Sequence, residues 1–153
     1  FCGQNLGAGK TDRIKKGILQ GVFVGMAYGL VAGIVLIFFG RTLTLLFVKP
    51  SATAVLDASA KYLRCLGFFY WSLGILNTCR MTTQGLGYSG RAILSGAVEM
   101  AARCFVSLAL VPIFHFDAIC FADQSAWITA TLYIVPTCLL VVRSIEKKRK
   151  ECK

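Results

Sequence analysis

The chain has 153 residues, of which 56% are hydrophobic and only 16% are charged, and its mean hydropathy is +0.67. This composition is too apolar for an ordinary soluble domain and predicts an all-α polytopic membrane protein with about four transmembrane helices. A formal net charge of +10 would suggest nucleic-acid binding in a soluble protein. Here the cations gather at the ends of apolar runs, so we expect no nucleic-acid partner.

Residues 1–16 form a short polar segment, which we expect to be a cytoplasmic loop. Phe1 is not a start methionine and no leader-like pattern follows it, so we expect the chain to be truncated at its front. The stretch Gly3–Thr11 approaches a phosphate-binding loop, but Gln4 stands where G-x-x-x-x-G-K-[ST] requires glycine. A membrane span follows this stretch, so ATP binding is rejected.

The first predicted span covers residues 18–39. The uncharged run from Gly17 to Gly40 has 24 residues and would form a helix of roughly 36 Å, longer than the roughly 30 Å of bilayer hydrocarbon. Glycine recurs every four residues in this run, at Gly17, Gly21, Gly25, Gly29 and Gly33. Such a ridge predicts close helix packing, either static or as a sliding contact.

The second predicted span covers residues 65–87, and an interfacial helix over residues 51–64 is predicted before it, opened by Pro50. Aromatic residues at 68–71 are typical of a membrane interface. The later half of the span is polar, with Asn77, Thr78, Arg80, Thr82, Thr83 and Gln84. This half is expected to face either water or partner helices.

The third and fourth predicted spans cover residues 92–114 and 124–142. Glu99 and Arg103 are four residues apart, so they share one face of the third span, where each offsets the charge of the other. The pair is either a functional group or a structural ion pair, and both interpretations stay open. Pro112 is expected at most to bend its span.

Other chemistry finds little support in the sequence. The residues of the last loop, His115, Asp117, Cys120 and Asp123, match no usual ligand spacing, so no metal site is predicted. The seven cysteines form no C-x-x-C pair, which argues against a disulfide framework and a zinc site. No nucleophile–base set can be assembled, so an enzyme is not expected.

Residues 143–153 form a basic tail. If four helices alternate in direction, the tail shares one side with the first loop and the loop between the second and third spans. That side collects Lys10, Arg13, Lys15, Lys16, Arg80, Arg91, Arg143, Lys147, Lys148, Arg149, Lys150 and Lys153. The other side has only four cations, so the positive-inside rule predicts that both termini lie in the cytoplasm. The expected location is the plasma membrane.

Five stretches resemble the second half of transporters of the multidrug and toxic compound extrusion (MATE) family. They are GQNLGAGKTDRIKKG at 3–17, YLR at 62–64, QGLGYSGRA at 84–92, GAVEMAARCFVSLALVP at 96–112 and CFADQSAWITATLYIVP at 120–136. They cover nearly the whole chain in the order of the family. The resemblance implies helices nine to twelve of a twelve-helix bundle made of two lobes.

The resemblance further implies the export of amphipathic organic cations in exchange for H⁺ or Na⁺, with no other cofactor. The partners would be membrane lipid and the missing N-terminal lobe. Glu99, with Arg103 as its partner, is the candidate for ion coupling, because it is the one carboxylate expected within the membrane. The NorM branch of the family carries a carboxylate that residues 74–77 lack, so ion coupling is expected to involve carboxylates of the missing lobe as well.

Cavity candidates follow from polarity and aromatic character. They are Asn77, Thr78, Gln84 and Tyr70, with Trp71 as a further ring that could face a cationic drug. Anchoring at the interface is the alternative role of the two rings. Two other functions remain open: a flippase for lipid-linked oligosaccharides from the same superfamily, and a four-helix scaffold that associates with itself through the glycine ridge.

Overall fold

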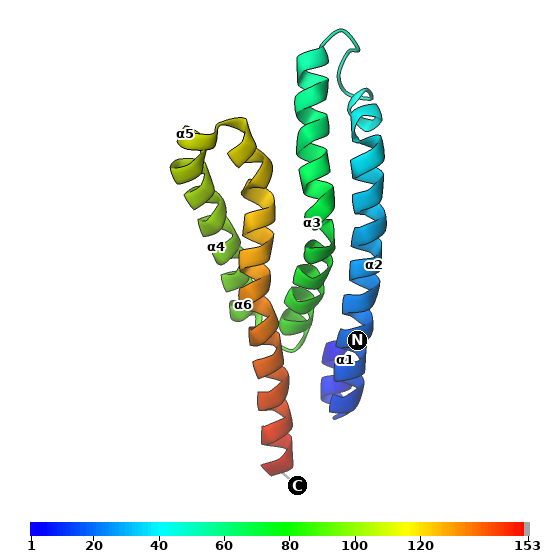
Figure 1. Ribbon diagram of the computed structural model, residues 1–153. Helices are drawn as coiled ribbons and strands as arrows, with labels where there is room; N and C mark the ends of the chain where they lie inside the picture. The colour runs from blue at the N-terminus through cyan, green and yellow to red at the C-terminus, as the bar shows by residue number, and fades with distance from the viewer. Residues whose placement is uncertain (152–153) are drawn as a thin grey trace.

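The computed structural model describes the backbone of residues 1–151 and the side chains through Arg149; Cys152, Lys153 and the side chains of Lys150 and Glu151 lie outside it. The described part is all-α and contains no strand. Its elements are α1 Cys2–Gly7, α2 Thr11–Thr44, α3 Thr53–Gly85, α4 Ser89–Phe105, the π-helix η1 Val106–Leu110, α5 Val111–Phe114 and α6 Phe116–Glu151. In Figure 1, α2 pairs with α3 and α4 pairs with α6, each pair antiparallel. The start of α2, the α3–α4 turn and the end of α6 lie at one end of the bundle.

Three helical stretches of the described chain are long and apolar enough to cross a membrane. They are Thr11–Thr44, Ser89–Phe114 and Phe116–Arg149. The helix α3, where the second span is predicted, is not among them, because Asn77, Arg80 and neighbouring threonines lower its hydropathy. It packs against α2, α4 and α6, and these neighbours cover part of its polar half.

The helix predicted over residues 51–64 is not a separate element. It is the first part of α3, which runs without a break from Thr53 to Gly85. No proline interrupts this stretch, and extending a formed helix is favourable where starting a new one is not. The start of the chain also differs from the predicted loop, because α1 occupies residues 2–7 and α2 already begins at Thr11.

The connection between the third and fourth predicted spans is much shorter than expected. His115 is the non-helical residue there, with a φ of 50°, and α6 begins at Phe116. Before it, the helix widens into η1 and turns into α5, which has Pro112 in its first turn. Proline has no N–H to continue the α-helical ladder, and a π-helical turn is a common adjustment to such a gap.

The glycine ridge of α2 lies against α3. A side chain at Gly29 would lie 2.8 Å from both the Trp71 Cα and the Tyr70 carbonyl oxygen, and one at Gly25 would lie 3.0 Å from the Gly74 carbonyl oxygen. Gly33 lies in the same way against Gly67 of α3. The backbones approach closely because α2 carries no side chain at these points, and α3 has glycine opposite Gly25 and Gly33. Gly17 differs from the rest of the ridge, since it faces the ring of Phe1.

The core of the bundle lies between α3 and α6. Its buried side chains are Leu76, Cys79, Trp127, Ala130, Ile134 and Cys138. A second cluster, Ile14, Leu86, Val141 and Val142, closes the end where the termini lie. The outward face of α2 exposes large apolar side chains such as Phe23 and Phe38, as expected of a surface that contacts lipid.

Candidate functional site

Glu99 accepts hydrogen bonds from two arginines. The Arg80 Nη2 of α3 lies 2.7 Å from its Oε2, and the Arg103 Nη2, one turn along α4, lies 2.9 Å from its Oε1. Arg80 also donates through Nε to the Ser95 Oγ at 2.8 Å. Both oxygens of the carboxylate are therefore held by guanidinium groups from two different helices.

The same contacts extend to α6 through Asp123. The Nε of Arg103 forms an ion pair with the Asp123 Oδ1 at 2.9 Å, without the alignment that a hydrogen bond needs. The Tyr62 hydroxyl of α3 donates to the other oxygen of Asp123. The Tyr62 hydroxyl therefore ties α3 to the carboxylate that also pairs with Arg103.

These six residues, Tyr62, Arg80, Ser95, Glu99, Arg103 and Asp123, are called the charged network below. Its two carboxylates and two guanidiniums sum to zero charge. The side chain of Glu99 is 14% exposed and that of Arg80 is 22% exposed. Charges removed from water are tolerated only when they are paired and hydrogen-bonded, so the members depend on one another.

A second ion pair lies outside the network, nearer the end of the bundle opposite the termini. Lys61 of α3 pairs with Asp117 of α6, and both side chains are largely exposed. The hydrogen bond to Asp117 raises the pKa of Lys61. An exposed pair of this kind contributes little to stability, which makes Asp117 a useful control for the carboxylates of the network.

The predicted cavity residues are not brought together. Asn77 and Gln84 are exposed on α3. The Thr78 hydroxyl lies 2.8 Å from the Gly74 carbonyl and 3.3 Å from that of Gly21, so it belongs to the α2–α3 contact. Tyr70 is partly buried and packs against the core, with its ring edge-on to Trp127 at a centroid distance of 5.9 Å.

Sequence reasoning misplaced two members of the charged network, Asp123 and Arg80, and did not single out Tyr62 or Ser95. It assigned Asp123 to a loop, whereas the acid lies two turns inside α6, so Glu99 is not the only carboxylate within the bundle. It also counted Arg80 among the cations at the end of the bundle, but the side chain turns inward because Glu99 and Ser95 offer it acceptors. Helical periodicity continued backwards from residue 124 could have indicated the position of Asp123.

Gln124 is a further buried polar group that the sequence did not single out. It is 1% exposed, and neither its amide oxygen nor its nitrogen has a hydrogen-bond partner in the described part of the chain. A buried amide without partners is costly, and such groups are usually satisfied by water or a ligand. Gln124 directly follows Asp123 in α6, so a second buried polar group stands next to the charged network along the chain.

Comparison with known proteins assigns the family. A family model described as MatE matches residues 1–108, which extend from the first residue of the chain into η1. Neither the curated proteins nor the solved structures give a match. The matched range covers well over half of the chain and includes Arg80, Glu99 and Arg103, so the chain belongs to the MatE family of membrane transporters.

Proposed function

We propose that this chain is part of the second lobe of a MATE-type secondary transporter that exports organic cations in exchange for H⁺ or Na⁺. Family membership supports a transporter in general terms. We further propose that the chain lies in the plasma membrane. It would cross this membrane four times and have both termini in the cytoplasm. The large excess of Lys and Arg toward the end of the bundle where the termini lie supports this orientation, even though Arg80 no longer counts toward it.

The observation that supports a role of Glu99 in ion coupling is its position between the guanidinium groups of Arg80 and Arg103. A proton or a sodium ion bound at Glu99 would compete with Arg80 and Arg103 for its oxygens. The two arginines would then lose their shared counter-charge in a region of low dielectric constant. Since the network joins α3, α4 and α6, occupancy by the coupling ion would change how these three helices pack.

The substrate cavity is proposed to lie between this lobe and an N-terminal lobe, as in carriers built from repeats. Asn77 and Gln84 remain candidates for its lining because their side chains are exposed on α3. Tyr70 and Thr78 are no longer proposed for this role, because their polar and aromatic groups are engaged inside the bundle.

The two alternative functions fit the structure less well. A flippase for a pyrophosphate-linked lipid needs cations without counter-charge inside the bundle, but Arg80 and Arg103 are both paired with carboxylates. A scaffold that associates through the glycine ridge needs that ridge at the surface. The ridge is instead used within the chain, where Gly25 to Gly33 contact α3.

The test is export by the complete transporter carrying Glu99→Gln, reconstituted in vesicles with an imposed pH or sodium gradient. We expect the efflux of a fluorescent organic cation to fall roughly tenfold or more and to lose its dependence on the gradient, since glutamine cannot exchange a proton. The measurement is the initial rate of efflux at several pH values.

The matched control is Asp117→Asn, which removes one carboxylate from an exposed pair outside the charged network. Its export rate should stay close to that of the unaltered protein. Both variants should first elute from a sizing column as the unaltered transporter does. Unchanged rate and unchanged pH dependence in Glu99→Gln would show that Glu99 only packs the bundle, and the coupling proposal would be wrong.

A further inference from the structure

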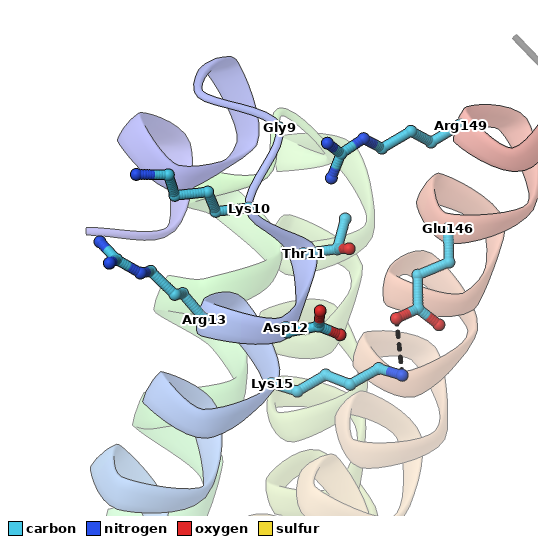
Figure 2. A pocket seen from close by; sticks show the side chains of 8 residues that line it. All are labelled: Gly9, Lys10, Thr11, Asp12, Arg13, Lys15, Glu146 and Arg149. Atoms are coloured by element: carbon cyan, nitrogen blue, oxygen red, sulfur yellow. Dashed lines mark ion pairs between the residues drawn. The ribbon is translucent and has the colours of Figure 1, made fainter. Parts of the chain in front are cut away.

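A cavity of about 670 Å³ lies between the start of α2 and the end of α6. Its lining residues are Gly9, Lys10, Thr11, Asp12, Arg13, Lys15, Glu146 and Arg149. Figure 2 shows that Arg149 reaches from α6 toward the turn at Gly9, while the ion pair of Lys15 and Glu146 bridges the two helices beside Thr11. Lys10 and Arg13 point to the other side of α2.

Lys15 and Arg149 are the cations that face this cavity, and of these two Arg149 has no ion-pair partner in the described part of the chain. No described carboxylate lies within ion-pair distance of it, whereas Lys15 and Glu146 are 2.6 Å apart. The guanidinium instead lies against the turn, where a side chain at Gly9 would come within 2.7 Å of its Nη2. The turn itself needs glycine, since Gly9 has a φ of 67°. Arg149 therefore presents a planar set of donors suited to a phosphate group.

An apolar crevice of about 540 Å³ adjoins this cavity, and Lys15 and Glu146 line both. Its α2 side carries Ile18, Leu19 and Val22, and its α6 side carries Val135, Leu139 and Val142. The uncharged run of α2 begins at Gly17, so the boundary between polar cavity and apolar crevice coincides with the expected edge of the bilayer hydrocarbon.

We propose that the cavity and crevice together bind one anionic phospholipid from the leaflet on the side of the chain termini. Arg149 and Lys15 would contact the phosphate, and an acyl chain would lie in the crevice between α2 and α6. Charge complementarity argues for this occupant, because Arg149 faces the cavity and has no ion-pair partner among the described residues. The apolar crevice argues for a lipid in place of a free anion, since a free anion has no apolar chain that could fill the crevice.

The experiment is native mass spectrometry of the complete transporter, titrated in detergent with phosphatidylglycerol or with phosphatidylcholine of the same acyl chains. We expect phosphatidylglycerol to be retained in preference. Arg149→Gln should weaken its retention about fivefold, the effect of one cation near an anionic lipid, and leave phosphatidylcholine unchanged. Leu139→Trp, which narrows the crevice, should weaken the retention of both lipids.

Arg91→Gln is the matched control, since Arg91 is exposed at the same end of the bundle and lines neither space. Equal retention of the two lipids by the unaltered protein would overturn the proposal. This comparison requires no substituted protein. Equal effects of Arg149→Gln and Arg91→Gln would overturn it too. Full displacement of phosphatidylglycerol by inorganic phosphate, with no effect of Leu139→Trp, would show an anion pocket without a lipid. Because the readout is lipid binding, it is independent of whether Glu99 couples export to an ion.

Discussion

Arg80 satisfies one buried and one largely buried group at once. Its Nε donates to Ser95, which is fully buried, and its Nη2 donates to Glu99. The planar guanidinium allows this because its donors point in fixed and different directions. A lysine ammonium is a single point charge and cannot take the same two positions. The charged network therefore depends on the kind of cation at this position as well as on its charge.

Replacing Arg80 should destabilise the complete transporter in proportion to the donors removed. Arg80→Met leaves one oxygen of Glu99 and the Ser95 hydroxyl without their donor, at a cost of about 1–3 kcal/mol for each unsatisfied group. Arg80→Lys should restore part of this loss. The measurement is the temperature at which the protein ceases to elute as a single species after heating.

Arg91→Met provides the comparison for Arg80→Met, because Arg91 is exposed and lies over the ring of Tyr88. It should shift the midpoint by much less. If Arg80→Met were as stable as Arg91→Met, the hydrogen bonds of the charged network would contribute nothing to the packing of α3 against α4.

At the scale of the elements, the contact of α2 with α3 is made of backbone. Gly25, Gly29 and Gly33 of α2 meet the backbone of α3, where Gly67 and Gly74 leave matching space. Lipid gives no hydrophobic drive for helices to associate, so close packing of this kind is what holds them together. The polar half of α3 lies partly inside the bundle as a consequence, and it supplies Arg80 to the charged network.

A methyl group at Gly29 should force α2 and α3 apart. In Gly29→Ala the new Cβ would lie 2.8 Å from the Trp71 Cα, and backbone cannot move aside as a flexible side chain can. Overpacking of this kind costs about 1–3 kcal/mol, which should lower the thermal midpoint of the complete transporter. The same heating and sizing assay measures the change.

Gly96→Ala is the matched control within α4, because no atom lies within 4 Å of the added methyl group. Alanine favours a helix more than glycine, so this variant should be as stable as the unaltered protein or slightly more stable. Equal stability of the Gly29 and Gly96 variants would mean that the two helices adjust at no cost, as a sliding contact would.

At the scale of the whole molecule, the bundle has one strongly basic end. The start of α2, the α3–α4 turn and the end of α6 lie there together (Figure 1), along with Lys16, Arg91, Arg143 and other cations. The opposite end has few cations, and Lys61 and Arg41 there are each paired with an aspartate. This asymmetry is the basis for the proposed orientation in the membrane.

Reporter fusions to the complete transporter should reveal that orientation. A fluorescent protein fused after Lys153 should be bright, and alkaline phosphatase at the same place should be inactive, because both termini are expected in the cytoplasm. Fusions after Pro50, in the α2–α3 connection, should give the reverse pattern. Active phosphatase after Lys153 would invert the proposed topology and place the lipid site in the outer leaflet.

The sequence by itself determined the class of the protein and much of its helical organisation. Apolar runs longer than the bilayer, the glycine period of α2 and the motifs of the family are local patterns, and local patterns can be recognised without a structure. The i,i+4 spacing of Glu99 and Arg103 likewise predicted their contact, because a helix places such residues on one face.

Tertiary structure alone decided which distant groups complete the charged network and how the glycine ridge is used. Tyr62, Arg80 and Asp123 join Glu99 from other helices, and no spacing along the chain encodes that meeting. Whether the polar face of α3 points to a cavity or into the bundle likewise depends on the rotation of the helix, which close contact with α2 sets. The physical reason is that helix periodicity fixes which side chains share a face, while the packing of neighbouring helices decides what that face meets.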